Sequence, residues 1–246
     1  MALRLDDTGF GGIKIWQEPT AFCYGIDAVL LAGFAAEGLE KRKQLGRVMD
    51  LGTGTGIIPL ILSHKTSAGY IGGIEIQSEP FQLAQRNIRE NQLEGRLHLF
   101  HENVKDFSEQ ELFGTFDVVT SNPPYTAGNC GIESSNPAKA VARHEISASL
   151  DDFIRLAANL LKDRGSFYLV HRPSRLVDIC ESCRRYKLEP KALRFVSGKP
   201  MEKPNILLVH CVKNGNPELK FLNPAYIHDA DGSYCPWVMK LYERDI

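Results

Sequence analysis

The sequence predicts an α/β fold in which a doubly wound, mostly parallel β-sheet carries helices on both faces. Short apolar runs typical of buried strands alternate with segments of helical periodicity along most of the 246 residues. A glycine-rich loop stands between the first core strand and the helix that follows it. The last two strands succeed one another without a helix between them, which predicts an antiparallel edge strand.

The elements follow in order from this pattern. Asp27 and Ser78 stand where N-caps are expected, Pro80 falls in a first helical turn, and Ser149 with Asp152 resembles a capping box. The predicted strands cover residues 46–51, 70–76, 96–100, 116–120, 167–171, 188–196 and 206–213. The predicted helices cover residues 28–36, 57–65, 79–91, 150–161 and 173–184.

Composition is ordinary for a globular protein, and the charge is unevenly spread. The net charge is −1, yet residues 139–220 carry sixteen lysines and arginines against nine aspartates and glutamates. We expect this positive half to face phosphates. No signal peptide is visible and the longest apolar run, 57–62, is too short to span a membrane, so we expect a cytoplasmic protein.

The cysteines predict neither a disulfide framework nor a metal site. Six are scattered through the chain, which favours free thiols. Cys180 and Cys183 form a CxxC, but it lies in a charged, helix-like stretch without a second ligand pair. We interpret these two as helix residues one turn apart and expect no metal.

The glycine loop predicts which cofactor binds. Its sequence is DLGTGTG, from Asp50 to Gly56, and the third glycine of a dinucleotide fingerprint is replaced by Ile57. An acid at the strand end suits a cofactor with a cationic amino-acid tail, and Glu75 ends the next strand where a carboxylate can bind ribose hydroxyls. This combination resembles the first two motifs of class I S-adenosylmethionine-dependent methyltransferases, which have a Rossmann-like fold. The cofactor residues expected here are Asp50, Gly52, Thr53, Gly54, Gly56, Glu75 and Ile76.

A third cofactor contact leaves two alternatives open. Asn103, followed by Val104, stands where such enzymes often carry an acid that contacts the adenine amine. An asparagine carbonyl oxygen can accept the same hydrogen bond with less charge assistance. Asp106 is the other candidate, unless it caps or orients the loop.

The tetrapeptide Asn122-Pro123-Pro124-Tyr125 follows a predicted strand directly and suits the methylation of a conjugated amine. The Asn122 side-chain oxygen and the Pro123 carbonyl can each accept one amine hydrogen, which concentrates the nitrogen lone pair and aims it. The prolines stiffen the backbone, and Tyr125 offers a ring for an extruded base. The motif resembles that of amino-methyltransferases acting on adenine N6, cytosine N4, guanine N2 or a glutamine amide.

Further segments resemble the bacterial tRNA1(Val) adenine-N6 methyltransferases, which modify the adenine just 3′ of the anticodon. The segments are 22–32, 142–145, 171–176 and 199–205, so the resemblance covers nearly the whole chain. It implies a seven-stranded sheet with an antiparallel seventh strand, a cap from Tyr24 to Asp27 over S-adenosylmethionine, and tRNA as the partner. We expect Asn122 to contact the cofactor as well. The RNA contacts it suggests are Arg143, His144, Arg172, Arg175 and Lys199.

Other functions stay open at this point. A release-factor-type glutamine N5-methyltransferase would use the same motif, but about 45 residues before Gly46 leave no room for its usual helical domain. A non-catalytic protein that binds S-adenosylmethionine and RNA is a second alternative, and a nicotinamide-dependent oxidoreductase is disfavoured by Ile57. We expect one domain, with an N-terminal cap (1–45), a catalytic core (46–213) and a C-terminal extension (214–246).

Overall fold

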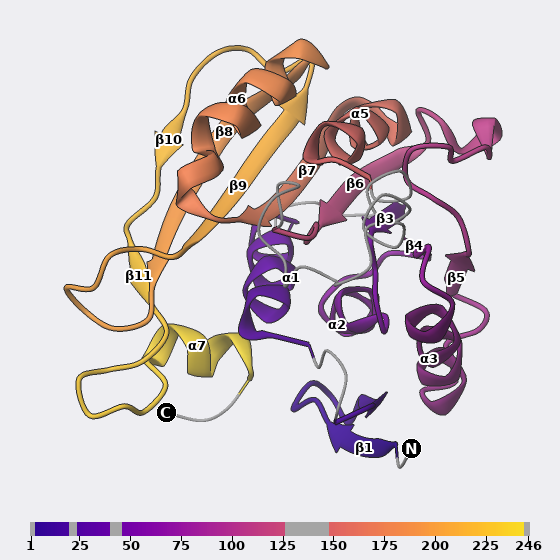
Figure 1. Cartoon of the computed structure of the whole chain (residues 1–246), viewed down its shortest axis with the longest axis horizontal. Helices are drawn as coiled ribbons and strands as arrows, with labels where there is room; N and C mark the ends of the chain where they lie inside the picture. The colour runs from indigo at the N-terminus through magenta and orange to yellow at the C-terminus, as the bar shows by residue number, and fades with distance from the viewer. Residues whose placement is uncertain (1–2, 20–23, 40–45, 126–147, 244–246) are drawn as a thin grey trace, which may run out of the picture.

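The structure of the chain is a computed structural model that describes residues 3–19, 24–39, 46–125 and 148–243 (Figure 1). Its strands are β1 (Arg4–Asp7), β2 (Lys14–Gln17), β3 (Arg47–Leu51), β4 (Tyr70–Ile74), β5 (Leu97–Phe100), β6 (Phe116–Ser121), β7 (Leu161–His171), β8 (Leu188–Ser197), β9 (Ile206–Lys213), β10 (Lys220–Phe221) and β11 (Ala225–Tyr226). Its helices are α1 (Ile26–Leu39), α2 (Ile57–Lys65), α3 (Ser78–Glu90), η1 (Gln110–Leu112), α5 (Leu150–Leu160), η2 (Pro173–Arg175), α6 (Leu176–Arg185) and α7 (Pro236–Leu241). All seven predicted strands are present.

The central sheet has the strand order β5-β4-β3-β6-β7-β9-β8, with the two-residue strands β10 and β11 added beside β8. Strands β3 to β7 are parallel, whereas β9 is antiparallel to both β7 and β8. The mostly parallel sheet is confirmed. The antiparallel strand, however, lies between two others instead of at the edge.

The composition of β9 explains its inner position. Leu207, Leu208, Val209 and Cys211 are fully buried, so both faces of the strand pack into the core. A strand buried on both faces reads as a continuous apolar run, as in the middle of a parallel sheet. After β7 the chain passes through α6 to β8, which lies two positions away from β7 in the sheet. Strand β9 then occupies the position between them.

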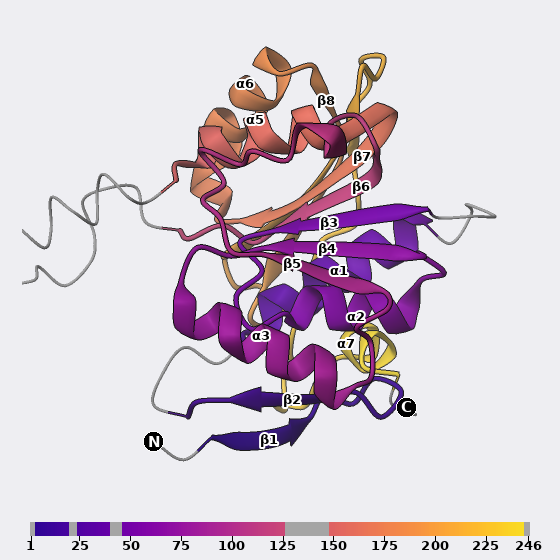
Figure 2. The ribbon, with the colours of Figure 1, turned by 90° about the vertical axis from the view of Figure 1, so that its right-hand side faces the viewer.

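Helices cover both faces of the sheet and create two hydrophobic cores. Figure 2 shows α1, α2 and α3 on one face and α5 and α6 on the other. The first core joins α1, α2 and α7 to the sheet, and the second joins α5 and α6 to it. Among the described residues, no helix has the length and apolarity to cross a bilayer.

Two of the three predicted helix caps are wrong. The capping box of Ser149 and Asp152 is present at the start of α5. Helix α1 already begins at Ile26, so Asp27 lies in its first turn, where its carboxylate accepts from the Ala28 backbone amide at 3.1 Å and from the Tyr125 hydroxyl at 2.7 Å. Residue 77, not Ser78, is the N-cap of α3, and the Ser78 hydroxyl lies 3.4 Å from the His101 ring. Both helices therefore begin one or two residues earlier than the local pattern indicates.

The N-terminal strands β1 and β2 form a hairpin that packs on α3 (Figure 2). The Lys14 backbone amide donates to Asn91 Oδ1 at 2.9 Å. The Arg86 guanidinium carbon lies 3.7 Å from the centroid of the Trp16 ring. The sequence did not predict these strands, because four residues of mixed polarity carry little periodicity.

Candidate active site

The glycine loop joins the end of β3 to α2 in a left-handed backbone conformation. Gly52, Gly54 and Gly56 have φ values of 71°, 57° and 86°, which favour glycine. The backbone amides of Gly52 and Thr53 both donate to the carbonyl of Ile74 at 2.9 Å, which ties the loop to β4. A side chain at Gly54 would meet nothing within 4 Å, so the loop backbone borders open space there.

Asp50 lies fully buried beneath this loop. Its Oδ1 accepts a hydrogen bond from the Thr120 hydroxyl at 2.6 Å, whereas its Oδ2 and the buried Thr53 hydroxyl have no partner among the described residues. Burial raises the pKa of Asp50 to about 7, and the charge of Glu75 adds to the rise. A buried acceptor without a donor costs about 1–3 kcal/mol, so this site fits a ligand that brings a cationic donor.

Glu75 follows β4 directly and is held in place by the loop itself. Its Oε2 accepts from the Gly54 amide at 2.9 Å and its Oε1 from the Gln77 amide at 2.8 Å. Each carboxylate oxygen can accept more than one hydrogen bond, so both retain capacity for ribose hydroxyls. Ile76, next to it, is 39% exposed and offers an apolar surface at the same edge of the sheet.

Asn103 and Val104 lie in the turn after β5. The Asn103 side-chain oxygen accepts from the Lys105 amide at 3.0 Å, and Val104 is buried. Asp106 is exposed, and its backbone amide donates to the Asn103 carbonyl at 3.0 Å. The two side chains thus differ in exposure, and each stays a candidate for the cofactor contact.

The Asn-Pro-Pro-Tyr segment begins where β6 ends, beside the glycine loop. Ser121 pairs in register with Leu51, and its hydroxyl donates to the Leu51 carbonyl at 3.0 Å. Asn122 is half-buried and Pro123 is buried. The Asn122 side chain makes no hydrogen bond to any residue that the structure describes, so its oxygen is available to an incoming amine.

Tyr125 connects three elements around this motif. Its hydroxyl donates to Asp27 Oδ2 at 2.7 Å, which joins the motif to α1. Its ring lies 5.0 Å from the His171 ring at the end of β7, and the Arg172 guanidinium carbon lies 5.6 Å from its centroid. Burial and the Asp27 carboxylate raise the pKa of Tyr125, so the hydroxyl stays protonated. Tyr24 lies at the other end of the predicted cap. Its backbone amide donates a hydrogen bond to Gln17 Oε1 at 3.0 Å.

His171 belongs to this site, and the sequence reasoning missed it as a site residue. It is 2% exposed, and burial together with Arg175 and Arg172 lowers its pKa to about 4. Its Nδ1 accepts from the Arg172 backbone amide at 2.8 Å, as a neutral ring can. The signal was its place at the end of the strand next to β6, which puts it at the same edge as the motif.

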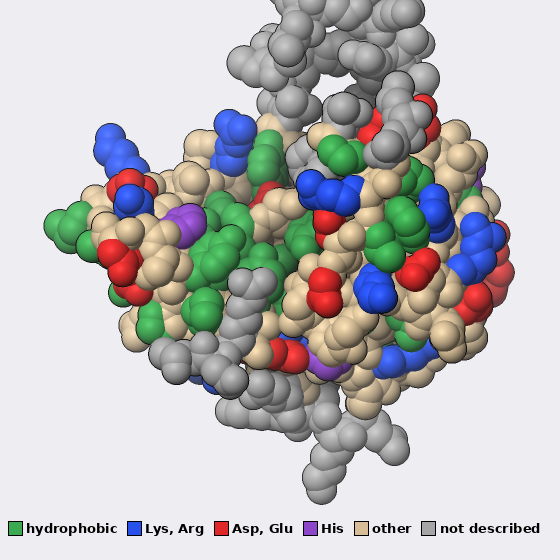
Figure 3. Space-filling view, turned by 90° about the horizontal axis from the view of Figure 1, so that it is seen from below, with side chains coloured by type: hydrophobic (Ala, Val, Ile, Leu, Met, Phe, Trp, Pro, Cys, Tyr) green, Lys and Arg blue, Asp and Glu red, His purple; other side chains and the backbone are tan. Residues whose placement is uncertain are grey.

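Of the predicted RNA contacts that the structure describes, Arg172 lies against the Tyr125 ring, and Arg175 acts on the neighbouring His171. Arg172 and Tyr125 line a cavity of about 430 Å³ with Pro173, Ser174, Pro204, Asn205 and Ile206. Arg175 is paired with Asp178 at 2.6 Å, and Lys199 lines a second cavity. Arg143 and His144 lie outside the described residues. On the face shown in Figure 3, basic and acidic side chains are interspersed and form no single positive patch.

The CxxC cysteines both lie on α6, but they do not pair with each other. Cys183 is buried, and its sulfur lies 3.7 Å from the sulfur of Cys211 on β9. Burial and Cys183 raise the pKa of Cys180, with burial the larger cause. Among the described residues, no group of three or more His, Cys, Asp or Glu is arranged to hold a metal ion.

Asn87, on α3, links the N-terminal hairpin to the glycine loop. This fully buried side chain accepts from the Trp16 amide at 2.6 Å and donates to the Thr55 carbonyl at 2.9 Å. Its partners lie 71 and 32 residues away in the chain. The hairpin thus supports the backbone that borders the cofactor region.

We expect Asn87→Ala to lower Tm by roughly 4–8 °C, because two buried backbone groups lose their partner. It should also weaken S-adenosylmethionine binding severalfold, since the loop loses a support. Thermal unfolding and calorimetric titration measure both effects. Asn91→Ala is the matched control: it removes the hydrogen bonds to Lys14 of the hairpin but no contact with the loop. Unchanged cofactor affinity in Asn87→Ala would contradict the link.

Residues 12–178 match the methyltransferase small domain family. The chain is 28% identical over 242 residues to a tRNA1(Val) (adenine(37)-N6)-methyltransferase of Porphyromonas gingivalis, covering 97% of this chain and 94% of that protein. A protein of the same name from Parabacteroides distasonis is 28% identical over 200 residues, which is 81% of each chain. A solved structure of a predicted O-methyltransferase from Agrobacterium tumefaciens aligns with a TM-score of 0.69 at 21% identity, over 88% of this chain and 95% of that one. This last likeness concerns the fold alone.

Proposed function

The chain belongs to the methyltransferase small domain family, and we propose that it methylates the N6 amine of an adenine in tRNA with S-adenosylmethionine as the methyl donor. The observation that carries the proposal is the position of Asn122-Pro123-Pro124-Tyr125 at the end of β6, one strand from the unpaired Asp50 oxygen and the glycine loop. The relatives that carry the tRNA1(Val) name include ones that align with most of this chain, which supports the substrate. A tRNA substrate in turn favours a cytoplasmic location.

The cofactor-binding side of the site is assigned to the elements before β6. Asp50 suits the ammonium of the amino-acid tail, and Glu75 suits the ribose hydroxyls. Ile76, Asn103 and Val104 are assigned to the adenine ring and its amine. When bound, S-adenosylmethionine would supply a sulfonium methyl group: the amine lone pair would form a bond to that methyl carbon while the carbon–sulfur bond breaks and a neutral thioether leaves.

Asn122 and Pro123 are assigned to the acceptor amine. An adenine N6 lone pair is delocalised into the ring and is a weak nucleophile. Two acceptors, the Asn122 side-chain oxygen and the Pro123 carbonyl, hold its two hydrogens and direct the lone pair. No strong general base is required, because the amine becomes acidic as it gains the methyl group. The neutral His171 fits this view, since it adds no positive charge beside the amine.

Tyr125 and Arg172 are assigned to the extruded base and its strand. The hydrogen bond to Asp27 fixes the Tyr125 ring, and a fixed ring is a better stacking surface for a flipped base. Arg172 lines the neighbouring cavity and can contact a phosphate. The family resemblance is the basis for four further proposed RNA contacts: Arg143, His144, Arg175 and Lys199.

The test is to incubate the purified protein with S-adenosylmethionine and an unmodified tRNA(Val) transcript. We expect N6-methyladenosine by mass spectrometry of the nucleosides, at the adenine 3′ of the anticodon after mapping. A transcript with that adenine replaced by guanine is the control and should stay unmethylated. Absence of N6-methyladenosine with cofactor binding demonstrated by calorimetry would overturn the tRNA(Val) substrate.

A further inference from the structure

The segment 198–205, which joins β8 to β9, lies at the same edge of the sheet as the candidate active site. Strand β8 runs parallel to β7, because β9 is antiparallel to both. Phe195 and His171 both pair with Leu207, so β7 ends level with Phe195 and β8 continues two residues further, to Ser197. The segment therefore extends beyond the sheet beside His171 and Arg172.

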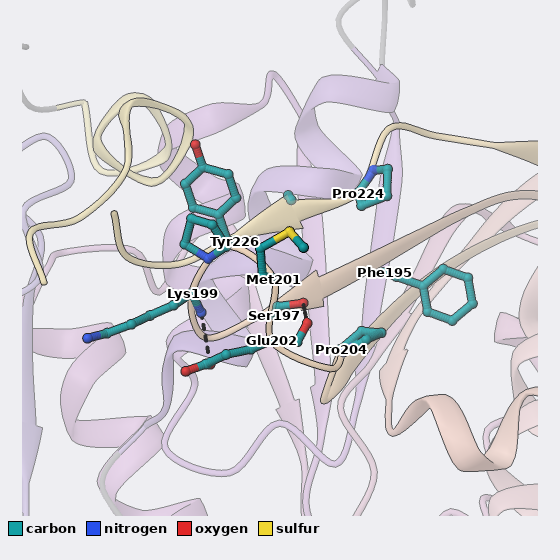
Figure 4. Close-up of a pocket in the computed structure, with 10 residues that line it drawn as sticks. Phe195, Ser197, Lys199, Met201, Glu202, Pro204, Pro224 and Tyr226 are labelled. Carbon is teal, nitrogen blue, oxygen red and sulfur yellow. Dashed lines mark hydrogen bonds between the residues drawn. The ribbon is translucent and has the colours of Figure 1, made fainter. Parts of the chain in front are cut away.

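This segment forms one wall of a cavity of about 340 Å³, which Figure 4 shows. The opposite wall comes from residues 224–226, which hydrogen bonds from Ile227 to Ser197 and from His228 to Gly198 hold in place. The lining is rich in rings and proline faces. It includes Phe195, Pro200, Pro204, Pro224 and Tyr226, with Met201 at the segment's tip.

Hydrogen bonds within the segment preform this wall. The Lys199 amide donates to the Glu202 carboxylate at 3.0 Å, and the Ser197 hydroxyl donates to the Glu202 carbonyl at 2.9 Å. Met201 is held at a φ of 67° and is fully exposed. Flat, rigid apolar surfaces that remain open to solvent are suited to stacking with a planar ligand.

The cavity adjoins the one at the candidate active site. Pro204 lines both this cavity and the one that contains Tyr125 and Arg172. Lys199 and Lys203 are exposed beside the apolar lining, and the Lys199 side chain extends away from it in Figure 4. The Glu202 carboxylate is already engaged by the Lys199 amide. Apolar stacking surfaces flanked by cations are typical of sites for single-stranded nucleic acid.

We propose that this cavity binds the base of an unpaired nucleotide next to the target adenine on the same RNA strand, with Lys199 at its phosphate. The inference rests on the proposed function and adds a second recognised base to it. A planar base would lie against Tyr226, Pro204 and Met201. The site would then select the sequence around the adenine as well as the adenine itself.

The experiment measures binding, so that it does not depend on turnover. An RNA stem-loop carries the target adenine unpaired, and two derivatives replace its 5′ or its 3′ neighbour with an abasic site. Fluorescence anisotropy gives Kd for the wild type and for the double variant Met201→Ala, Tyr226→Ala. For the wild type, we expect one of the two abasic sites to raise Kd about tenfold.

Coupling between base and cavity is the decisive result. The double variant should bind the intact RNA about tenfold more weakly, and the same abasic site should then cause no further loss. Phe221→Ala is the control, because Phe221 is 69% exposed but lies outside the cavity lining. Met201→Ala alone keeps the test valid if Tyr226→Ala disturbs folding, because Met201 is fully exposed.

Additive losses, no effect of either abasic site, or no binding of the RNA by the wild type would each overturn the proposal. Its failure is distinguishable from failure of the proposed function. Normal N6-methyladenosine formation with additive losses removes only the second base site. Coupled losses without N6-methyladenosine keep the base site and remove the assigned reaction.

Discussion

Asn122→Ala is expected to lower kcat for N6-methyladenosine formation by at least about a hundredfold, because removal of one preorganised polar group at a reacting centre has that effect. Cofactor affinity should stay within about twofold of the wild type. The Asn122 side chain makes no hydrogen bond to the described residues, so its removal leaves no partner there unpaired. Single-turnover kinetics with saturating tRNA separate this loss from weaker tRNA binding.

Asn122→Asp is the matched variant for this prediction. A carboxylate keeps an acceptor at the same position, so part of the activity should return relative to alanine. Thermal unfolding should place both variants close to the wild type, since Asn122 is half-buried beside a rigid Pro-Pro pair. Full activity in Asn122→Ala would show that the amine is oriented by other groups.

Asp50→Asn is expected to have opposite effects on ligand binding and on stability. The change removes a charge-assisted contact with a cationic ligand, so S-adenosylmethionine affinity should fall by about 10- to 100-fold. The cofactor-free protein should become more stable at pH 8, because it no longer buries a carboxylate with an unpaired oxygen. Calorimetric titration and thermal unfolding measure the two effects.

The pH dependence follows from the raised pKa. In the folded protein burial raises the pKa of Asp50 to about 7, from 3.8 for an ordinary aspartate, so between these values the folded state binds more protons than the unfolded state. Stability of the cofactor-free wild type should therefore decrease as pH rises from about 4 to about 7, and this contribution should vanish in Asp50→Asn.

Cofactor affinity should change in the other direction. It should increase as pH rises through about 7, because a cationic ligand favours the ionised Asp50. Thr120→Val is the control, since it keeps the carboxyl and removes the hydroxyl that donates to it. The pH at which affinity rises should then move upward. A wild-type affinity without pH dependence between 5.5 and 8 would mean that Asp50 does not contact the charged tail.

The sequence predicted the parts of the site that depend on local order. Asp50, Glu75 and Asn122 each follow a strand of clear apolar pattern, and parallel strands place their carboxyl ends together. Local order did not predict the place of β9 in the sheet, because the pairing partners of a strand depend on how all the strands pack together. The caps expected at Asp27 and Ser78 were wrong because both helices begin earlier than the local pattern indicates, which places these residues inside the first turn.

Two buried polar residues of the site were not predicted from the sequence. Asn87 looks like an ordinary residue of an amphipathic helix, yet its partners lie on the hairpin and the glycine loop. His171 ends a strand as many residues do, and only folding places it against Tyr125. Both residues matter because of contacts with segments that are distant in the chain, and the local sequence pattern does not reveal such contacts.

The strand order has a consequence for how such an enzyme can diversify. Strand β3 lies inside the sheet, with β4 and β5 on one side and β6 to β9 on the other. The proposed donor-side residues come from β3, β4, β5 and the loops after them, whereas the acceptor-side residues come from β6 onward. Mutation and selection can therefore remodel the segment 198–205 for a new target while the donor half stays unchanged. The two halves of one sheet can evolve at different rates.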